Sequence, residues 1–321
     1  MKNVFLWPEG KVLHALCKAY SLTPLKRIED RLREMFPSGY PVLCTSGRSA
    51  LVLALMQSGV KRNDQVGIFP YASHCVLDAV SRFGTPLNGQ GAISANIRLV
   101  YHQWGYVQET NLPENTIEDC ADTLCRPGTP LFPAGGRYEI WSLPKILGTT
   151  SGGVLWCRDE FTAISLRKIR DSKLNGSFQW LLRLLLSRFS GLYNYWQGAE
   201  GGLLNVSRLQ TGEILAAIHK WDKIVSDRQK KLELVWPYAV EYLQRPINRL
   251  PSVVPLKTEI LETELVALGI NTGFRMFERV ELNKSRFLEK VLPLPIHQDM
   301  SMKKLEGCLV VFKITLSNNG I

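Results

Sequence analysis

The sequence predicts an α/β fold: a large domain with a mostly parallel mixed sheet flanked by helices, and a smaller C-terminal α+β domain. Three observations support this prediction. Between Pro41 and Arg170, short apolar runs alternate with amphipathic stretches, which is the order expected of βαβ units. A long, densely charged helical pattern covers residues 208–245. A shorter mixed segment begins at Pro251.

Length and composition agree with this organisation. The chain has 321 residues, enough for two domains of roughly 150 residues each. Hydrophobic residues make up 45% and charged residues 21%, which excludes a disordered chain, a collagen and a small disulfide scaffold. We place the domain boundary within the long helical pattern, so that residues 1–225 form the large domain and 226–321 the small one.

The elements follow in a regular order. The first 36 residues carry a helical pattern rich in Lys and Arg, which ends at the Pro-Ser-Gly turn of residues 37–39. After Gly39, strands are expected at 41–44, 65–69, 97–101, 138–141 and 153–157, and helices at 49–56, 75–83 and 161–170. In the small domain, the run 269–276 is strand-like.

Charge and cysteine content narrow the function classes. The net charge of +10 attracts nucleic acid, anionic lipid or phosphorylated small molecules, but no nucleic-acid-binding motif is present. The seven cysteines form no CxxC pair, so we expect reduced, buried thiols and no metal site. The N-terminus lacks the apolar core of a signal peptide, and no apolar run is long enough to span a membrane. These features predict a cytoplasmic protein.

Ligands on parallel sheets bind in the loops at the carboxyl ends of the strands, and four such loops carry chemistry. The first is Thr45-Ser-Gly-Arg-Ser, which runs into a helix. Small residues there allow a sharp turn and present backbone N–H groups to a phosphate. A purely structural helix cap is the alternative interpretation.

The second and third loops supply an acid and an amine. Glu118 and Asp119 end a short apolar run, where a carboxylate can pair with a protonated ring nitrogen or simply cap a helix. Lys145 follows a strand, with Ser142 three residues before it and small residues after it. A lysine amine in such a loop can form a Schiff base, although most lysines are solvated surface charges.

The fourth loop, Phe69-Pro-Tyr-Ala-Ser-His-Cys75, offers an aromatic or imidazole ring for stacking, or an ordinary hydrogen-bonded histidine, His74. The order of the four loops is phosphate turn, stacking loop, acid and lysine. Pyridoxal phosphate needs this set of groups: donors for its phosphate, a face for its ring, an acid for its pyridine nitrogen and an amine for its aldehyde.

At this point the chain resembles the DegT/DnrJ/StrS family of sugar aminotransferases, which have the type I fold of pyridoxal phosphate (PLP) enzymes. The resemblance extends from about Pro41 to Phe312. It is carried by an ordered series of segments: Thr45–Leu55, Lys61–Val66, Phe69–Tyr71, Val100–Gly105, Ile117–Ala121, Ser142–Gly153, Leu292–His297 and Met300–Met302.

The resemblance implies roles for individual residues. Lys145 would form the Schiff base with the cofactor and move the substrate proton, and Asp119 would pair with the pyridine nitrogen. The backbone amides of Arg48 and Ser49, with the Ser142 hydroxyl, would hold the phosphate.

Two further roles follow from the same resemblance. His74 would stack on the cofactor ring. Asn205, contributed by the neighbouring subunit, would complete the phosphate site, which implies a homodimer with shared active sites.

The implied activity is transfer of an amino group from an amino acid, with glutamate expected, to a keto-sugar, nucleotide-linked, in polysaccharide or related sugar biosynthesis. Two alternatives stay open: another PLP sugar enzyme such as a dehydratase, and a degenerate homologue that acts as a scaffold. The dehydratases typically replace the lysine that is present here.

Three departures from the family pattern stand near the site. Asp122 occupies a position where relatives usually have Gln or His. The spacing from Ser142 to Lys145 is three residues rather than the five common in the family. The stretch between Gly84 and Ile97 is short, which predicts the loss of part of the usual wall around the site.

Residues 178–196 combine apolar bulk with Arg183 and Arg188. They fit either a helix that touches a membrane surface or a helix buried in the dimer contact or against the active site. We favour the buried helix.

Overall fold

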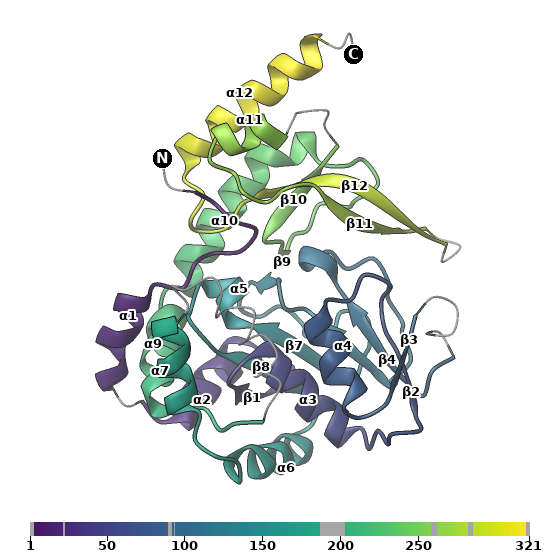
Figure 1. The fold of residues 1–321 in the computed structure, drawn as a ribbon, viewed down its shortest axis with the longest axis vertical. Helices are drawn as coiled ribbons and strands as arrows, with labels where there is room; N and C mark the ends of the chain where they lie inside the picture. Colours follow the sequence, from purple (N-terminus) through teal and green to yellow (C-terminus); the bar gives the residue numbers. More distant parts are fainter. Residues whose placement is uncertain are drawn as a thin grey trace.

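The computed structural model describes residues 3–21, 23–88, 92, 94–186, 203–257, 262–281 and 285–318. The chain forms two parts, one above the other in Figure 1. The lower part contains a seven-stranded sheet in the order β1-β8-β7-β5-β4-β2-β3, and the upper part a three-stranded sheet in the order β10-β12-β11. None of the described helices is long and apolar enough to cross a membrane.

The large sheet is mostly parallel, as the alternating pattern predicts. Its strands are β1 (Tyr40–Cys44), β2 (Gln65–Gly67), β3 (Thr85–Leu87), β4 (Ile97–Tyr101), β5 (Thr116–Asp119), β7 (Tyr138–Ser142) and β8 (Gly153–Cys157). Every neighbouring pair is parallel except those of β8, which runs antiparallel to both β1 and β7. The carboxyl ends of β2, β4, β5 and β7 therefore lie along one edge of the sheet.

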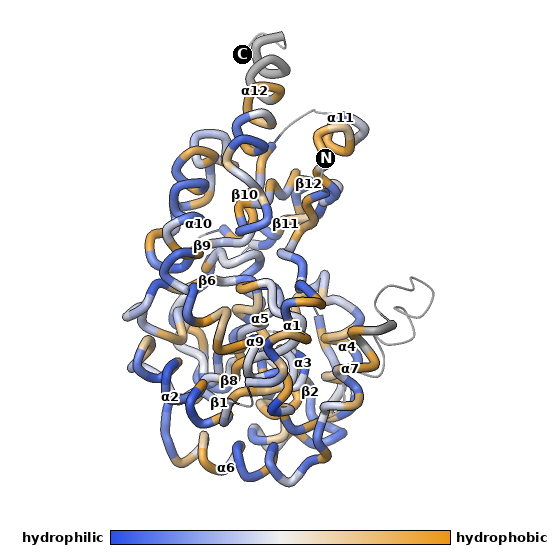
Figure 2. The backbone as a smooth tube through the Cα atoms, turned by 90° about the vertical axis from the view of Figure 1, so that its left-hand side faces the viewer, coloured by the Kyte–Doolittle hydropathy of each residue, from blue (hydrophilic) through white to orange (hydrophobic). Residues whose placement is uncertain are grey.

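Helices cover this sheet and link it to the upper part. The helices of the lower part are α1 (Val12–Lys18), α2 (Leu25–Met35), α3 (Gly47–Gln57), α4 (His74–Ser81), α5 (Leu143–Leu147), α6 (Glu160–Asp171), α7 (Ser177–Leu186) and α9 (Arg208–Ile218). From the large sheet, α10 (Trp221–Val235) rises toward the upper part, as Figures 1 and 2 both show. The two-stranded pair β6 (Leu124–Cys125) and β9 (Arg249–Leu250) lies at the junction.

The upper part packs helices against its antiparallel sheet. It contains β10 (Val253–Leu256), α11 (Glu262–Ala267), β11 (Arg275–Val280), β12 (Arg286–Pro295) and α12 (Met302–Asn318). The strand expected at 269–276 begins only at Arg275, since the turn after α11 takes up the residues before it. The division of the chain at residue 225 stays a prediction.

One expectation about the helices was wrong in detail. The pattern over 208–245 is two helices, because the chain bends at His219 and Lys220 between α9 and α10. A short 3-10 turn, Trp236–Tyr238, ends the second helix. The Pro at position 237 has no N–H for a continuing helix, which explains the stop.

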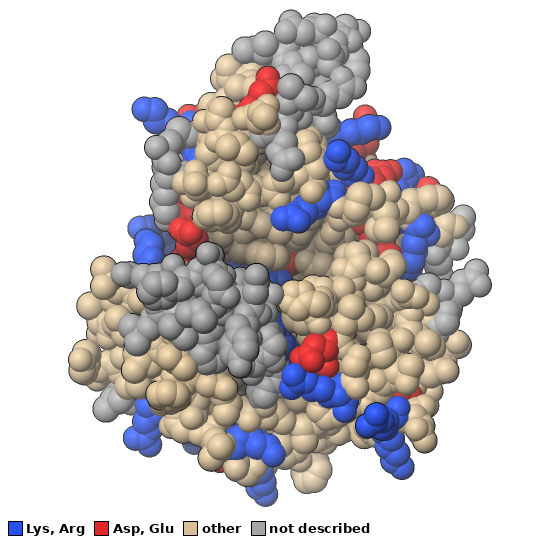
Figure 3. All heavy atoms as spheres, in the orientation of Figure 1, with Lys and Arg blue, Asp and Glu red and all other residues tan. Residues whose placement is uncertain are grey.

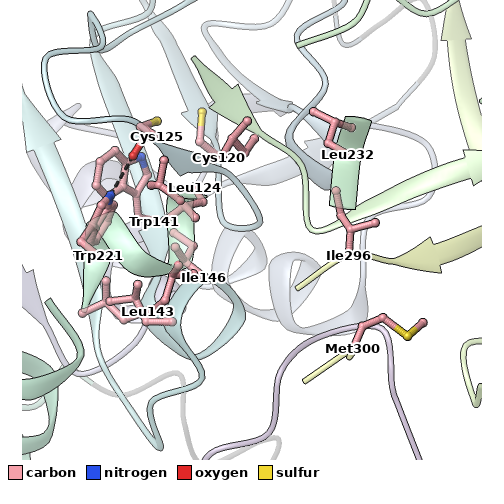
Figure 4. Close-up of a cluster of buried hydrophobic side chains, with 14 of the residues drawn as sticks. Cys120, Leu124, Cys125, Trp141, Leu143, Ile146, Trp221, Leu232, Ile296 and Met300 are labelled. Carbon is pink, nitrogen blue, oxygen red and sulfur yellow. Dashed lines mark hydrogen bonds between the residues drawn. The ribbon is translucent and has the colours of Figure 1, made fainter. Parts of the chain in front are cut away.

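The main core runs from the large sheet into the upper part. Around Trp141, Trp221 and Ile296, apolar side chains from β7, α10 and the segment after β12 join one buried cluster (Figure 4). The indole N–H of Trp221 donates to the carbonyl of Cys125 at 2.8 Å, drawn as the dashed line in Figure 4. The described cysteines carry free thiols, and five of the seven are buried, as the sequence predicts.

Candidate active site

The site is built at the edge where the parallel strands end. Asp119 is the last residue of β5, Tyr101 the last of β4, and Lys145 lies in the short helix α5 directly after β7. The sequence predicts a loop around Lys145, whereas the structure forms one helical turn that Gly148, at φ 71°, ends in the left-handed conformation. That turn fixes the backbone from which the lysine side chain extends.

Lys145 is held by a buried carboxylate. Its Nζ lies 3.1 Å from Oδ1 of Asp122, whose side chain is fully buried, while the lysine side chain keeps 31% of its surface exposed. The hydroxyl of Tyr101 donates to the other oxygen of Asp122. Burial alone would lower the pKa of Lys145, but the carboxylates of Asp122 and Asp119 outweigh it and raise that pKa above the ordinary value.

Asp119 is the second acid of this group. Burial raises its pKa to about 6, an effect that Lys145 opposes and Asp122 reinforces. Its Oδ1 accepts a hydrogen bond from the backbone N–H of Ala121 at 3.0 Å, which fixes the carboxylate at the end of β5. Above about pH 6 this carboxylate is ionised, the state needed to pair with a protonated ring nitrogen.

The start of α3 forms a small, polar cradle next to the end of β7, the strand that precedes Lys145. Ser46 is the N-cap residue, and its hydroxyl accepts from the backbone N–H of Ser49 at 3.1 Å. The hydroxyls of Thr45 and Ser49 are 2.8 Å apart. Ser142 lies beside this turn, since a Cβ built on Gly47 would come within 3.3 Å of its Cβ.

A glycine lets β8 lie close against the cradle. A Cβ on Gly153, the first residue of β8, would lie 2.3 Å from the carbonyl carbon of Ser46, so only glycine fits there. The helix dipole and the first-turn amides of α3 favour an anion at this point. The cradle, the amine of Lys145 and the acid Asp119 therefore fit the phosphate, aldehyde and ring nitrogen of PLP.

The remaining predicted residues lie around this group. His74 is the exposed first residue of α4. The backbone of Asn205 pairs with the chain at 174–176, and Gly176 of that pair faces Thr45 of the same chain. The stacking role of His74 and the contribution of Asn205 to a neighbouring subunit stay predictions.

The segment 178–196 lies partly outside the described residues. In the part described, α7 buries Trp180, whose indole N–H donates to the hydroxyl of Thr150 at 3.1 Å. Thr150 belongs to the loop that follows Lys145. This contact supports a helix packed beside the active site, while Phe178 on the opposite side is 74% exposed.

Two groups of this region, Trp7 and Tyr101, were missed by the sequence analysis. The ring of Trp7 lies 4.3 Å from Nζ of Lys145, measured to its centroid. Tyr101 reaches Asp122 as described above, and Asp122 itself was noted only as a departure from the family pattern. No signal in the sequence links Trp7 to Lys145, because 137 intervening residues separate them.

A cavity of about 270 Å³ lies beside Tyr101, which lines it. The cavity is lined by Phe69 and Tyr101 of the lower part and by Glu278 and Arg286 of the upper part. Lys145 is not among its lining residues. Arg286 pairs with both Glu278, at 2.9 Å, and Glu109, at 2.5 Å. Within the described residues, Oε1 of Glu278 is buried without a hydrogen-bond donor. This oxygen can accept a hydrogen bond from a ligand hydroxyl or amine.

His102, Glu118 and Cys120 form a buried group whose side-chain atoms lie within 4.8 Å of one another. These atoms are already engaged. Glu118 accepts from His102 and from the backbone N–H groups of Ala134 and Gly136, and Cys120 accepts from Arg249. Their hydrogen bonds give the group a structural role beneath the site.

Comparisons with known proteins agree with this geometry. Residues 28–300 match a family model described as a PLP-dependent aminotransferase. Among solved structures, the fold is similar to a DegT DnrJ EryC1 StrS aminotransferase from Brucella abortus (15% identity, 94% of each chain, TM-score 0.62). It is also similar to the aminotransferase TlmJ from Streptoalloteichus hindustanus (16% identity, 99% of this chain and 100% of that one, TM-score 0.66).

A third similar structure is the sugar aminotransferase CalS13 from Micromonospora echinospora, with 15% identity over 97% of this chain and 98% of that chain and a TM-score of 0.64. At such identities the likeness shows the fold, which is the one that the sequence predicts. No sequence among the curated proteins matches the chain.

Proposed function

The chain belongs to the family of PLP-dependent aminotransferases, and from this premise we propose that it transfers the amino group of glutamate to a nucleotide-linked keto-sugar. The observation that carries the proposal is the position of the Lys145 amine. It is held 3.1 Å from a buried carboxylate, with Asp119 beside it and an anion cradle at the start of α3.

PLP, when bound, supplies an aldehyde that condenses with amines and a pyridine ring that takes up carbanion charge. Nζ of Lys145 would be the amine that holds the cofactor. The same nitrogen would also be the acid–base group of the site, able to accept and return a proton at the reacting carbon. The carboxylates of Asp122 and Asp119 would keep a proton available on this nitrogen.

Asp119 has a different task. Its carboxylate would keep the ring nitrogen protonated, and the acid is ionised above about pH 6. The amides of Arg48 and Ser49, with the hydroxyl of Ser142, are the proposed phosphate ligands. The N–H of Ser49 already donates to Ser46, so it would be shared or exchanged when the phosphate binds.

The sugar part of the proposal has its own support. CalS13, one of the similar structures, is described as a sugar aminotransferase. The cavity beside Tyr101 carries two arginines and two glutamates in paired positions, so its charge is balanced, and Glu278 offers a free acceptor oxygen. Balanced charge with a spare acceptor suits an uncharged, hydroxyl-bearing ring.

The setting of the reaction completes the proposal. We expect a cytoplasmic enzyme of polysaccharide or related sugar biosynthesis, active as a homodimer in which each subunit contributes to the partner's site. Asn205 would lie at that shared boundary. The positive charge of the chain suits a substrate that carries phosphates.

The test follows the cofactor spectrum through both halves of the reaction. Glutamate added to the PLP-loaded protein should abolish the visible absorbance. A nucleotide-linked keto-hexose should restore it, with an amino-sugar detected by mass spectrometry. Pyruvate and glyoxylate serve as competing acceptors. Restoration by these oxo acids and by none of a panel of keto-sugars would contradict the proposed substrate.

A further inference from the structure

The N-terminal segment, residues 4–10, ties the two parts of the molecule together across the site. Val4 pairs with the upper part: its N–H donates to Gly269 at 2.9 Å, and its carbonyl accepts from Asn271 at 2.8 Å. Further along, the N–H of Glu9 donates to Asp299 at 2.8 Å. Both ends of the segment are therefore fixed.

Contacts with His297 and the lysine loop hold the middle of the segment. The ring of His297 bonds the carbonyl of Phe5 at 2.9 Å. Burial lowers the pKa of His297 to about 4, so the ring is neutral at pH 7 and its Nε2 donates this bond. Pro8 packs against Gly148, where an added Cβ would come within 3.2 Å of the proline ring.

Trp7 is placed by these contacts directly on the reacting amine. Its ring centroid lies 4.3 Å from Nζ of Lys145, within the range of a cation–π interaction. Any molecule joined to that nitrogen must lie against the indole or beside it. The ring therefore forms one wall of the reaction centre and limits the access of water to Nζ.

The indole N–H adds a second observation. Nε1 of Trp7 is buried, and no acceptor for it is present among the described residues. A buried donor without an acceptor is costly, and most such groups in proteins have a partner. Next to an ammonium group, the acceptor best suited to this N–H is an anionic oxygen.

We propose that Trp7 is a ligand-binding residue of the active site, whose indole N–H donates to an anionic oxygen bound beside Lys145. The inference rests on the proposed function, because this oxygen belongs either to the carboxylate of the amino-acid donor or to the cofactor. The donor carboxylate is one bond away from the carbon that exchanges its proton with Nζ, which places it within reach of the indole.

Trp7→Phe keeps the ring and removes only the N–H. We expect the affinity for the ligand that carries the oxygen to fall roughly tenfold or more, the usual effect of losing a hydrogen bond to a charged group. A PLP titration followed by absorbance measures the affinity for the cofactor. The KM for glutamate reports on binding of the amino-acid donor. A loss in either measurement supports the proposal and identifies the source of the oxygen.

Fluorescence gives a readout that does not depend on turnover. PLP absorbs near the emission of tryptophan, so loading the protein should quench a tryptophan that touches the site. Trp7→Phe should remove a larger share of this quenching than Trp236→Phe, the matched control, whose indole opens the 3-10 turn after α10. The thermal unfolding of both variants, compared with the wild type, shows whether a substitution has merely loosened the packing of the N-terminal segment.

Equal PLP affinity, glutamate KM and quenching in Trp7→Phe and Trp236→Phe would overturn the inference. The wild-type protein separates this outcome from failure of the proposed function. If the wild type loads PLP and loses its visible band with glutamate, the reaction stands and only the role of Trp7 falls.

Discussion

The amine of Lys145 lies in surroundings that hold a proton on it. Asp122 is the closest group, at 3.1 Å, and its second oxygen is occupied by the hydroxyl of Tyr101. This carboxylate is buried, so its field at Nζ is weakly screened by water. A lysine must lose its proton before it can attack an aldehyde, so we expect Asp122 to set the pH at which Lys145 can capture the cofactor.

Asp122→Asn tests this control. Without the carboxylate, burial lowers the pKa of Lys145 with less opposition, so that pKa should fall. The rate at which the apo-protein gains visible absorbance after mixing with PLP should then rise at lower pH than in the wild type. Asp30→Asn, which removes an exposed carboxylate of α2, is the control for net charge. Superimposable pH–rate profiles for all three proteins would show that Asp122 has no such role.

At the scale of residues, the sequence identifies the groups that stand in recognisable local patterns. Ser142 and Lys145 are three positions apart, and Asp119 ends an apolar run, so each can be located from its neighbours. Trp7 and Tyr101 have no such pattern. Their places depend on how the N-terminal segment and β4 fold against the site, which only the three-dimensional structure reveals.

Among the elements, α9 supports the lysine loop. Glu213 of this helix accepts from the N–H of Thr150 at 3.0 Å and from its hydroxyl at 2.5 Å. Burial raises the pKa of Glu213 to about 7, even though both bonds from Thr150 lower it. The folded protein therefore binds this proton more strongly than the unfolded chain does.

The sign of the pH effect follows. Stability from a carboxyl with a raised pKa is fully present below about pH 4.5, its ordinary value, and is lost as the pH rises through about 7. Glu213→Gln removes this loss, so the variant should gain about 3 kcal/mol relative to the wild type between pH 4.5 and pH 8. Urea unfolding at both pH values measures it. Glu114→Gln, at an exposed position, should show no such gain, and an equal change for both variants would refute the explanation.

The elements themselves were largely predictable. Five expected strands and three expected helices of the large sheet region form close to their predicted limits, because apolar periodicity and turn residues mark them clearly. The 208–245 pattern was read as one helix, since the bend at His219 and Lys220 contains neither Gly nor Pro. Tertiary packing, with Trp221 buried beneath β6, sets that bend.

At the scale of the whole molecule, a cavity lies next to the shortened stretch between Gly84 and Ile97. The cavity lined by Phe69, Tyr101 and Glu278 lies at the same edge of the sheet, next to the strand that follows this stretch. The sequence predicts a missing part of the wall there. The chemistry of the cavity depends on β11 and β12, which reach it from the other end of the chain.

Charge is also a property of the whole. On the face shown in Figure 3, Lys and Arg side chains are scattered among acidic ones rather than gathered in one patch. Many pair with carboxylates, as Arg170 does with Glu29 in the interior. On this face the distribution gives no support to a nucleic-acid groove, and a local anion site at the start of α3 agrees better with the fold.

The central claim is that Lys145 holds the cofactor. Purified protein should be incubated with PLP, reduced with borohydride and digested, and the peptides analysed by mass spectrometry. We expect a single stable adduct on Lys145, with loss of the visible band. The Lys145→Ala variant should show neither the band nor the adduct. An adduct on a different peptide, or a wild-type Lys145 that carries no adduct after saturation with PLP and reduction, would contradict the account.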